Sequence, residues 1–356
     1  MTASLETVHF DAVPEPDKIA REQALARQAI LTKPTGALGR LEDVSVWLAG
    51  VQGRCPPVRP QRIRVVIFAG DHGVTAAGVS AYPSEVTAQM VANFVTGGAA
   101  VNVLARGVGA GVRVVDIAVG SDLPGFVLPS EVTRWKVRRG SGRLDVENAL
   151  TAEETVQAVN AGKAIADEEI DAGADLLIPG DMGIGNTTPA SVLIGVLTNL
   201  DADVVTGHGT GIDDDGLVRK RAVVAAGIAR AETMQDPLSL IAAVGGADIA
   251  AMAGFLAQAA VRRTPVLLDG LVSGAAALLA QRLAPGAAAW WAAGHRSVEP
   301  AHRFALETLG LHPLIDLGLR LGEGSGALVA VPIITAAADI LEGMATFGEA
   351  NVSNRG

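Results

Sequence analysis

A glycine-rich segment near the middle of the chain has the residue types and spacing of a phosphate-binding loop. The apolar run 176–178 predicts a short buried strand, and three glycines follow between positions 180 and 185. Thr188 is a favoured helix N-cap and Pro189 a favoured first helical residue, so we expect a helix over 190–197. Free backbone N–H groups and the positive end of the helix dipole would then meet at one place, which can hold a phosphate.

This segment differs from two better-known phosphate loops. No Lys-Ser/Thr pair follows its glycines, as a P-loop requires. Thr188 stands where a dinucleotide fingerprint has its third glycine. A tight turn between a strand and a helix is the alternative, and the paired hydroxyls of Thr187 and Thr188 favour the phosphate site.

A second candidate is Glu323, which lies between glycines in the segment Gly322-Glu323-Gly324-Ser325-Gly326. The segment follows the apolar run 314–317, which we interpret as the last strand. Glycines let a backbone approach a ligand closely, so the carboxylate would project into a site. An exposed acidic loop is the alternative.

Further polar residues follow expected strands. Gly207 and Gly209 form a second glycine loop after an expected strand at 204–205, and Lys220 on the next helix is either a phosphate partner or a surface residue. The Asp71-His72 pair is either functional or a turn cap with an incidental histidine, and His295 is interpreted as structural. The consecutive aspartates 213–215 do not indicate a metal site, because they could not all face one ion without a strained loop.

These residues must be positioned by alternating strands and helices, which predict a doubly wound, mostly parallel, Rossmann-like α/β sheet with helices on both faces. The expected strands are 63–68, 113–119, 176–178, 204–205, 265–269, 287–292 and 314–317. The expected helices include 15–31, 40–51, a run ending near 105, 151–172 with a Thr151–Glu154 capping box, 190–197 and 327–344.

Composition excludes several classes of protein. Hydrophobic residues are 49% of the chain, aromatic residues only 3%, and there are 42 glycines, which suits closely packed α/β layers. The formal charge is −10 without a basic block, so no nucleic-acid partner is expected. The lone Cys55 excludes an internal disulfide and fits a reducing compartment. Residues 1–17 lack the apolar core of a signal peptide and 86–105 is too polar for a membrane span, so we expect a cytoplasmic protein.

Several motifs together resemble the nicotinate-nucleotide–dimethylbenzimidazole phosphoribosyltransferase family of cobalamin synthesis, in the family's order and over about residues 33–350. The motifs are Lys33-Pro34-x-Gly36-x-Leu38-Gly39-x-Leu41-Glu42, Gly70-Asp71-His72-Gly73-Val74, Pro83-x-Glu85-Val86-Thr87, Gly183-Ile184-Gly185-Asn186-Thr187-Thr188, Asp269-Gly270, His295-Arg296-Ser297-x-Glu299-Pro300 and Gly322-Glu323-Gly324-Ser325-Gly326.

The resemblance implies a reaction and an architecture. Ribose 5-phosphate would pass from nicotinate mononucleotide to dimethylbenzimidazole, giving α-ribazole 5′-phosphate and nicotinate. The family combines a parallel-sheet domain, here 60–326, with a small helical domain built from both chain ends, here 1–59 and 327–356. It also forms homodimers.

The resemblance assigns roles residue by residue. Glu323 would be the general base, with Asp181 a second catalytic candidate, although many members of the family carry Glu at the position of Asp181. The nucleotide and its phosphate would be bound by Gly183, Ile184, Gly185, Asn186, Thr187, Thr188, Gly207, Gly209 and Lys220. The base pocket would include Tyr82, Glu85, Met90, Met182 and Leu321.

This chemistry requires neither a metal nor another cofactor. Nicotinate leaves as a pyridine from a nitrogen that already carries positive charge, whereas a pyrophosphate leaving group needs Mg²⁺ to neutralise it. The incoming benzimidazole must lose a proton, and a carboxylate in apolar surroundings can accept it.

Two other readings remain open. An NAD-linked oxidoreductase would need a dinucleotide fingerprint and a ribose-binding acid, which are not found. A regulatory module would bind a nucleotide without consuming it. The preferred acceptor base and any contact of the arginines at 134–139 with substrate also stay open.

Overall fold

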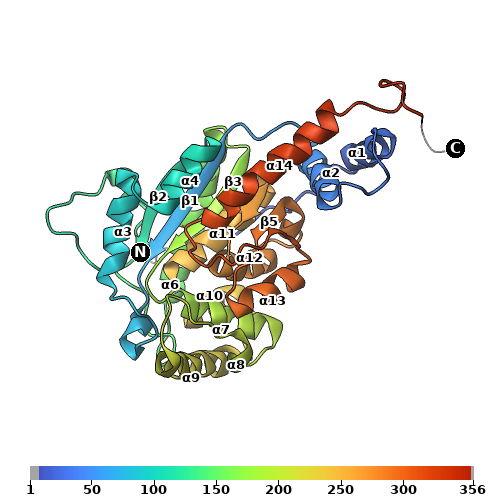
Figure 1. Cartoon of the computed structure of the whole chain (residues 1–356). Coiled ribbons are helices and arrows are strands. Elements are labelled where there is room, and N and C mark those ends of the chain that lie inside the picture. The colour runs from blue at the N-terminus through green and yellow to red at the C-terminus, as the bar shows by residue number, and fades with distance from the viewer. Residues whose placement is uncertain (1–7, 354–356) are drawn as a thin grey trace.

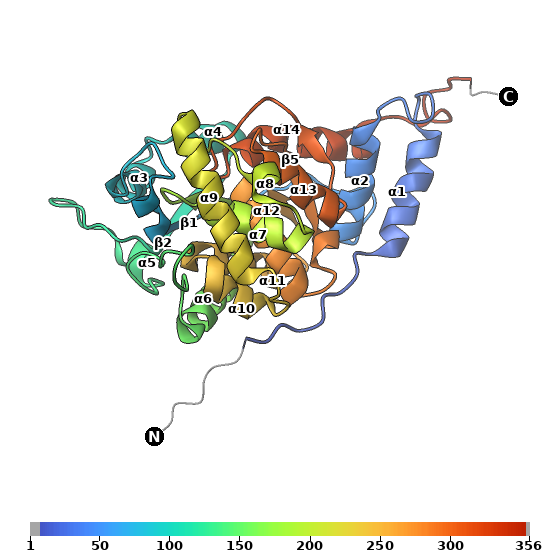
Figure 2. The ribbon, with the colours of Figure 1, turned by 90° about the horizontal axis from the view of Figure 1, so that it is seen from below.

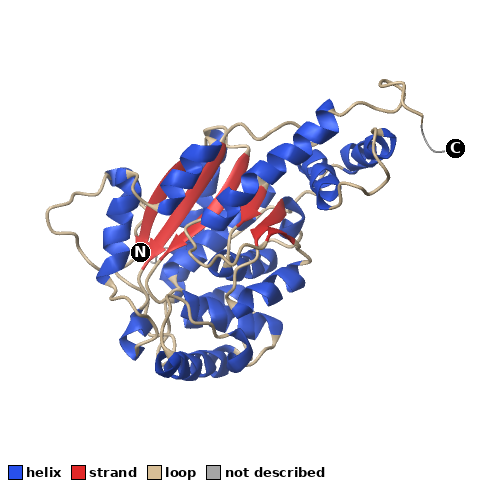
Figure 3. Cartoon of the chain, viewed as in Figure 1, coloured by secondary structure: helices blue, strands red, loops and turns tan. Residues whose placement is uncertain are grey.

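The computed structural model describes residues 8–353, and its core is a six-stranded sheet in which neighbouring strands run parallel. Figure 3 shows these strands in red between blue helices. The strands are β1 (Ile63–Gly70), β2 (Gly111–Ala118), β3 (Leu176–Met182), β4 (Val266–Leu268), β5 (Trp291–His295) and β6 (Pro313–Ile315). The predicted doubly wound α/β fold is confirmed.

Strand order places one end of the sheet where a ligand can bind. The order is β2-β1-β3-β4-β5-β6, so the chain leaves β1 toward one edge and returns to the other side of β1 as β3. Open parallel sheets bind ligands at the carboxyl ends of strands that flank such a reversal. The central strands are apolar and buried on both faces, as layers of helices on each side require.

Helices connect the strands and cover both faces. Their bounds are α1 Lys18–Ile30, α2 Arg40–Gln52, η1 Gly73–Ala77, α3 Glu85–Thr96, α4 Ala100–Val108, α5 Ser130–Thr133, α6 Ala152–Asp171, α7 Thr187–Thr198, α8 Ala202–Val205, α9 Asp214–Ala231, α10 Pro237–Val244, α11 Ala247–Val261, α12 Leu271–Leu283, η2 Ala287–Trp290, α13 Pro300–Leu309 and α14 Ser325–Gly343. Helices α3, α4 and α14 contact one face of the sheet, whereas α11 and α12 contact the other and α6 packs on α11 (Figure 1).

Small residues allow the closest of these contacts. A Cβ built at Gly162 of α6 would lie 1.7 Å from the carbonyl oxygen of Ala251, and one at Gly254 of α11 would lie 2.1 Å from that of Val159. The two helices therefore touch backbone to backbone. This contact explains why a chain with so few aromatic residues packs densely.

Three local expectations are corrected. Residues 204–205 belong to the one-turn helix α8 and not to a strand, because the N–H groups of Val204 and Val205 donate to Asp201. Residues 287–290 form a 3₁₀ turn, so the fifth strand begins at Trp291. Helix α7 starts at Thr187 with Asn186 as its N-cap, two residues before Pro189. The Thr151–Glu154 capping box is confirmed.

The two ends of the chain lie together. Leu31 after α1 forms a bridge with Thr346 after α14, and α14 contacts α1, α2 and β5. Figures 1 and 2 show the α1–α2 pair beside the far end of α14, away from the sheet. Helix α14 therefore links this helical pair to the sheet.

In the part of the chain that the structure describes, two stretches have the length and apolar composition of a membrane span, Glu85–Val108 and Ser325–Gly343. The first is two helices, α3 and α4, separated at Gly97, whose φ of +82° ends α3. The second is α14, which contains Pro332 and packs on α2, α4 and β5. Packing within the fold buries 39% of the apolar window of the first stretch and 50% of that of the second.

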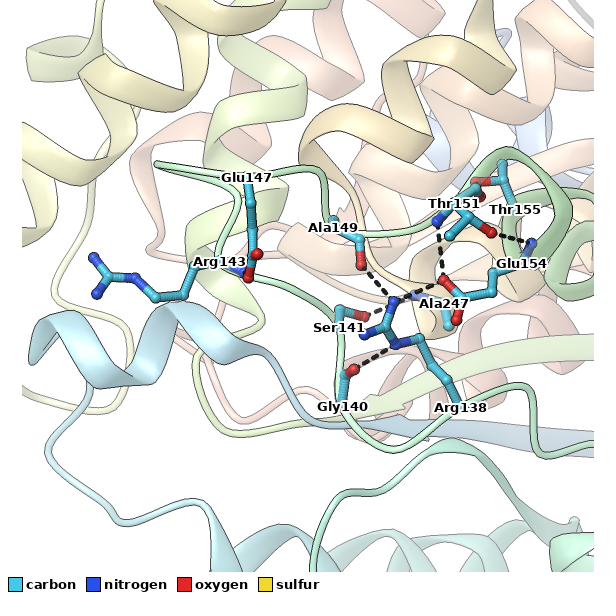
Figure 4. Close-up of polar contacts among 10 residues, drawn as sticks. All are labelled: Arg138, Gly140, Ser141, Arg143, Glu147, Ala149, Thr151, Glu154, Thr155 and Ala247. Carbon is cyan, nitrogen blue, oxygen red and sulfur yellow. Dashed lines mark hydrogen bonds and ion pairs between the residues drawn. The ribbon is translucent and has the colours of Figure 1, made fainter.

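The arginines at 134–139 make ion pairs and backbone contacts away from the strand ends that carry the site. Arg134 pairs with Glu168, and Arg139 pairs with Asp122. Arg138 donates to Glu154 at 2.7 Å and to the carbonyl oxygens of Gly140 and Ala149, as Figure 4 shows. These contacts fasten the 134–149 segment to the start of α6.

Candidate active site

A pocket of about 680 Å³ opens at the carboxyl ends of β3, β4, β5 and β6. Its walls come from the ends of these strands and from the loops that follow them. The lining residues are Tyr82, Val86, Met90, Asp181, Met182, Gly183, Ile184, Asn186, Thr187, Gly209, Thr210, Gly270, Leu271, Val272, His295, Ser297, Glu299, Gly318, Leu319, Arg320, Leu321, Gly322 and Glu323.

One wall is the glycine turn between β3 and α7. Gly183 packs so closely on β1 that a Cβ there would lie 2.0 Å from the carbonyl oxygen of Gly70. Gly185 has a φ of +91°, which glycine adopts readily, and the N–H of Ile184 donates to Thr87 at 3.0 Å. Within residues 8–353 the N–H groups of Gly185 and Thr187 have no acceptor. The turn is therefore rigid and offers N–H donors at a helix start, where an anion is stabilised.

Lys220 reaches this turn from α9. Its side chain is fully buried, and the ammonium donates to the Thr187 hydroxyl at 2.7 Å. Burial lowers the pKa of Lys220 to about 8, although the carboxylate of Glu299 acts in the opposite direction. The ammonium thus lies behind Thr187 as the cation of this wall.

A second wall of the pocket carries Glu323, which is 4% exposed. Its φ is +65° and both neighbours, Gly322 and Gly324, also have positive φ. A non-glycine residue in this conformation costs about 1–2 kcal/mol, so the surroundings must hold it. The buried Asp269 carboxylate does so, accepting the N–H groups of Gly324 at 3.1 Å and Ala327 at 2.9 Å.

The electrostatics of this wall favour a protonatable Glu323. Burial raises the pKa of Glu323, a backbone N–H at Val101 lowers it, and the Asp269 carboxylate raises it. One carboxyl oxygen, Oε2, is buried and has no hydrogen-bond partner within residues 8–353. A carboxylate with a raised pKa and a free oxygen on a pocket wall is suited to accept a proton from a ligand.

Asp181 lies beside Glu323 at the end of β3. Burial is the main cause that raises its pKa well above the usual value, and the charges of Asp269, Asp248 and Glu323 add to it. Asn186 donates to Asp181 Oδ2 at 2.7 Å, which acts against this rise. Asp181 therefore has a partner inside the turn, whereas Glu323 Oε2 has none.

The residues predicted for the base pocket are brought together with one exception. Tyr82, Met90, Met182 and Leu321 line the pocket, and Tyr82 and Leu321 are more than half exposed at its mouth. Glu85 is exposed on α3 and does not line the pocket.

The residues predicted for the nucleotide divide in the same way. Five of them line the pocket: Gly183, Ile184, Asn186, Thr187 and Gly209. Gly185 and Thr188 shape the turn from behind, and Gly207 lines a neighbouring hollow of about 580 Å³.

The Asp71-His72 pair lies beneath the turn and not in the pocket. His72 is buried and its Nε2 is 3.0 Å from Asp248 Oδ2, a partner on α11. Burial disfavours the charged imidazolium, yet Asp248 and then Asp71 outweigh it and raise the pKa of His72. The Asp71-His72 pair therefore has a structural position under Gly183.

Sequence reasoning missed part of the pocket. His295, interpreted as structural, lines it with Nε2 3.5 Å from Asp269 Oδ1, and Ser297, Glu299 and Arg320 line it as well. His295, Ser297 and Glu299 belong to one motif used for the family resemblance, which was the available signal. The positions of His295, Ser297 and Glu299 in the pocket depend on contacts with segments far away in the chain, which the neighbouring sequence does not reveal.

The fold and this pocket define an α/β enzyme whose pocket combines a glycine turn at a helix start with a group of buried carboxylates. A family model described as phosphoribosyltransferase matches residues 13–352. The chain is 60% identical over 348 residues to the nicotinate-nucleotide–dimethylbenzimidazole phosphoribosyltransferase of Mycobacterium avium, covering 98% of this chain and 99% of that protein. It is 58% identical over 349 residues to the Mycobacterium tuberculosis protein of the same name, covering 98% and 96%.

A solved structure agrees. The crystal structure of the Thermus thermophilus enzyme with this name superposes with a TM-score of 0.88 at 46% identity, covering 95% of this chain and all of that one. The chain therefore belongs to the nicotinate-nucleotide–dimethylbenzimidazole phosphoribosyltransferase family.

Proposed function

We propose that this transferase moves ribose 5-phosphate from nicotinate mononucleotide to dimethylbenzimidazole, giving α-ribazole 5′-phosphate and nicotinate, in assembly of the cobalamin nucleotide loop. The names of its relatives state the two substrates. The observation that carries the proposal is Glu323, a buried carboxylate on the pocket wall with an unpartnered oxygen and a raised pKa.

The nucleotide phosphate is assigned to the turn at 183–187. The free N–H groups of Gly185 and Thr187 and the start of α7 favour a negative charge there. Lys220 adds a positive charge behind the Thr187 hydroxyl. These groups bind the same phosphate in substrate and product, so they contribute to affinity and orientation.

The acceptor base is assigned to the apolar part of the pocket. Met90, Met182 and Leu321 offer flat or adaptable apolar surface to an aromatic ring, and Tyr82 stands at the mouth. We assign the base to the part of the pocket beside Glu323, because Leu321 is two residues before Glu323 in the chain.

The chemical step balances without an added reagent. One benzimidazole nitrogen donates its electron pair to C1′ of the ribose, and the bond from C1′ to the nicotinate nitrogen breaks. Nicotinate leaves with that electron pair and its ring becomes neutral. Glu323 takes the proton from the second benzimidazole nitrogen, so the product ring is also neutral. Asp181 is assigned a positioning role beside the reacting atoms.

The leaving group is the reason that no metal is assigned a role. The ring nitrogen of nicotinate mononucleotide is already cationic, so its departure needs no Lewis acid. The aspartates at 213–215 have another use, since Asp213 caps α9 by accepting the N–H of Gly216 at 2.8 Å. Turnover that stops with a chelator and returns with Mg²⁺ would overturn this assignment.

Incubation with both substrates tests the proposal. We expect mass spectrometry to detect α-ribazole 5′-phosphate and nicotinate in equal amounts. Nucleotide that binds and is recovered unchanged in the presence of dimethylbenzimidazole would contradict it and favour the regulatory module.

The assembly and location of the enzyme are also proposals. We assign a cytoplasmic homodimer, and a division into an α/β domain at 60–326 and a helical domain from the two chain ends. The motives are the family resemblance, the lone Cys55 and the packing of α1 and α2 on α14. Light scattering that gives the mass of one 36.3 kDa chain would contradict the dimer.

A further inference from the structure

Glu299 is a buried carboxylate of the pocket that the reaction scheme above does not use. It is 5% exposed and immediately precedes the first residue of α13. Its Oε1 accepts the N–H of Gly209 at 2.9 Å, and its Oε2 is buried without a hydrogen-bond partner within residues 8–353. Leaving such an oxygen unpaired is costly, so a use for its charge is expected.

The segment 207–209 connects Glu299 to Lys220. A Cβ at Gly207 would lie 2.2 Å from Glu299 Oε2, and one at Gly209 would lie 2.9 Å from Lys220 Nζ and 2.8 Å from Thr187 Oγ1. Positions 207 and 209 therefore favour glycine, because a Cβ at either one would lie closer than 3 Å to these side-chain atoms. The carboxylate and the ammonium therefore contact the same segment, without forming a direct ion pair.

Glu299 is the carboxylate that acts on Lys220. Helix α7 contributes the neutral Thr187 hydroxyl. The loop before α9 contributes His208, whose Nδ1 lies 3.0 Å from the Ile212 carbonyl oxygen, and the segment before α14 contributes Arg320, which donates to the Gly209 carbonyl oxygen. On α9 itself, the neighbouring residues Arg219 and Arg221 are cations.

We propose that Glu299 is a positioning residue that fixes the 207–209 segment and keeps Lys220 protonated beside the phosphate-binding turn. This inference rests on the proposed function, since it assigns the ammonium to the nucleotide phosphate. Glu299 raises the pKa of Lys220 against the effect of burial, which lowers that pKa to about 8. Removing the carboxylate charge would therefore leave more Lys220 neutral at a given pH.

The predicted effect is a change in how nucleotide affinity depends on pH. Well below the pKa that Lys220 has in either protein, the ammonium is charged with or without Glu299, so affinity should be equal, or higher without a nearby negative charge. Above it, loss of the carboxylate should weaken binding. The affinities of wild type and a charge-neutral variant should thus diverge as pH rises, while proton removal by Glu323 is unaffected.

The test is calorimetric titration of nicotinate mononucleotide, without acceptor base, from pH 7.0 to 9.0. The phosphate stays dianionic over this range because its second pKa is about 6. Glu299→Gln keeps an acceptor for the Gly209 N–H and removes only the charge. We expect the ratio of its Kd to that of wild type to rise by about three- to tenfold over the range, the effect of up to one pKa unit on Lys220.

A second variant, at Lys220, distinguishes this electrostatic role of Glu299 from a structural one. Lys220→Met should weaken binding and flatten its pH dependence, and adding Glu299→Gln to it should not restore any dependence on pH. If Glu299→Gln weakens binding by the same factor at every pH, Glu299 has only a structural role and the inference is wrong. If wild type itself does not bind the nucleotide, the proposed function fails instead.

The conservative variant keeps the test usable should Glu299→Gln fail to fold. Glu299→Asp retains the charge on a shorter stem and withdraws it from Lys220. The Kd of Glu299→Asp should rise with pH more steeply than that of wild type and less steeply than the Kd expected for Glu299→Gln. A Glu299→Asp profile that runs parallel to wild type over the whole range would overturn the inference.

Discussion

The two walls of the pocket carry ionisable groups of opposite charge. The phosphate wall, which we assign to the nucleotide, has the α7 start, the buried Lys220 and two N–H groups without an acceptor within residues 8–353. The carboxylate wall has Asp181 and Glu323 in front of the buried Asp269. Burial disfavours charge on both, so it lowers the pKa of Lys220 and raises the pKa of Glu323. The phosphate wall must keep its charge to bind, while the carboxylate wall must be able to gain a proton and lose it again.

The backbone conformation also differs between the two walls. The phosphate turn uses glycine at positive φ and is anchored to Gly70 and Thr87, so its N–H donors are fixed. At the other wall a glutamate itself adopts positive φ and is held by Asp269. Strain is therefore found at the residue assigned to proton transfer.

The largest effect should come from the carboxylate wall. Glu323→Gln keeps the shape of the side chain but cannot accept a proton, so kcat should fall at least about a hundredfold. The KM for the nucleotide should change little, because its phosphate binds at the other wall. Steady-state kinetics test this, with the exposed Glu307→Gln on α13 as the matched control. Near-full turnover with chemistry rate-limiting would place the base elsewhere, with Asp181 as the next candidate in the pocket.

The next effect should come from the phosphate wall. Lys220→Met removes a charge-assisted contact worth about 1.5–3 kcal/mol, so the KM for nicotinate mononucleotide should rise about ten- to a hundredfold. Lys18→Met, at an exposed surface pair with Glu15, is the control. An unchanged KM together with a reduced kcat would show that the two walls are not separate in function.

A smaller effect is expected at Asp181. Burial and neighbouring charges already raise the pKa of Asp181, so Asp181→Asn should leave the acidic limb of the kcat profile near that of wild type, and kcat at neutral pH should fall less than in Glu323→Gln. A kcat–pH series measures both. A loss as large as that of Glu323→Gln would make Asp181 part of the proton transfer.

The smallest effect on kcat should come from the contact between helices α6 and α11, which is remote from both walls. Gly254→Ala places a methyl group against the Val159 carbonyl oxygen and should lower the free energy of unfolding by about 1–3 kcal/mol. Its kcat should stay near that of wild type. Gly343→Ala, where a Cβ meets no atom within 4 Å, is the control in urea denaturation. Equal stability of both variants would contradict the close packing.

The features that could be predicted from sequence are those that depend on residues close together in the chain. Continuous apolar runs mark β1 and β3, glycine spacing marks the 183–185 turn, and flanking glycines mark Glu323. Val204-Val205 misled because two β-branched residues are too short a run to outweigh a local helical turn at Asp201.

What could not be predicted depends on residues far apart in the chain. Lys220 was identified as a phosphate candidate, but its burial behind Thr187 and its relation to Glu299 arise only when α7, α9 and α13 pack together. Asp269 reaches Gly324 and His295 from a different strand in the same way. Nothing in the residues next to Asp269 indicates either partner.

Measuring the pH dependence of kcat and of nucleotide affinity separately shows whether Glu323 accepts the proton while Lys220 serves nucleotide binding. In wild type, kcat should fall as pH drops through the raised pKa of Glu323, because the protonated carboxyl cannot accept a proton. Nucleotide affinity should fall as pH rises through the pKa of Lys220, about 8. We expect Glu323→Gln to lose the acidic limb of kcat and to keep the alkaline limb of affinity. An acidic limb that persists unchanged in Glu323→Gln would contradict the assignment of the base.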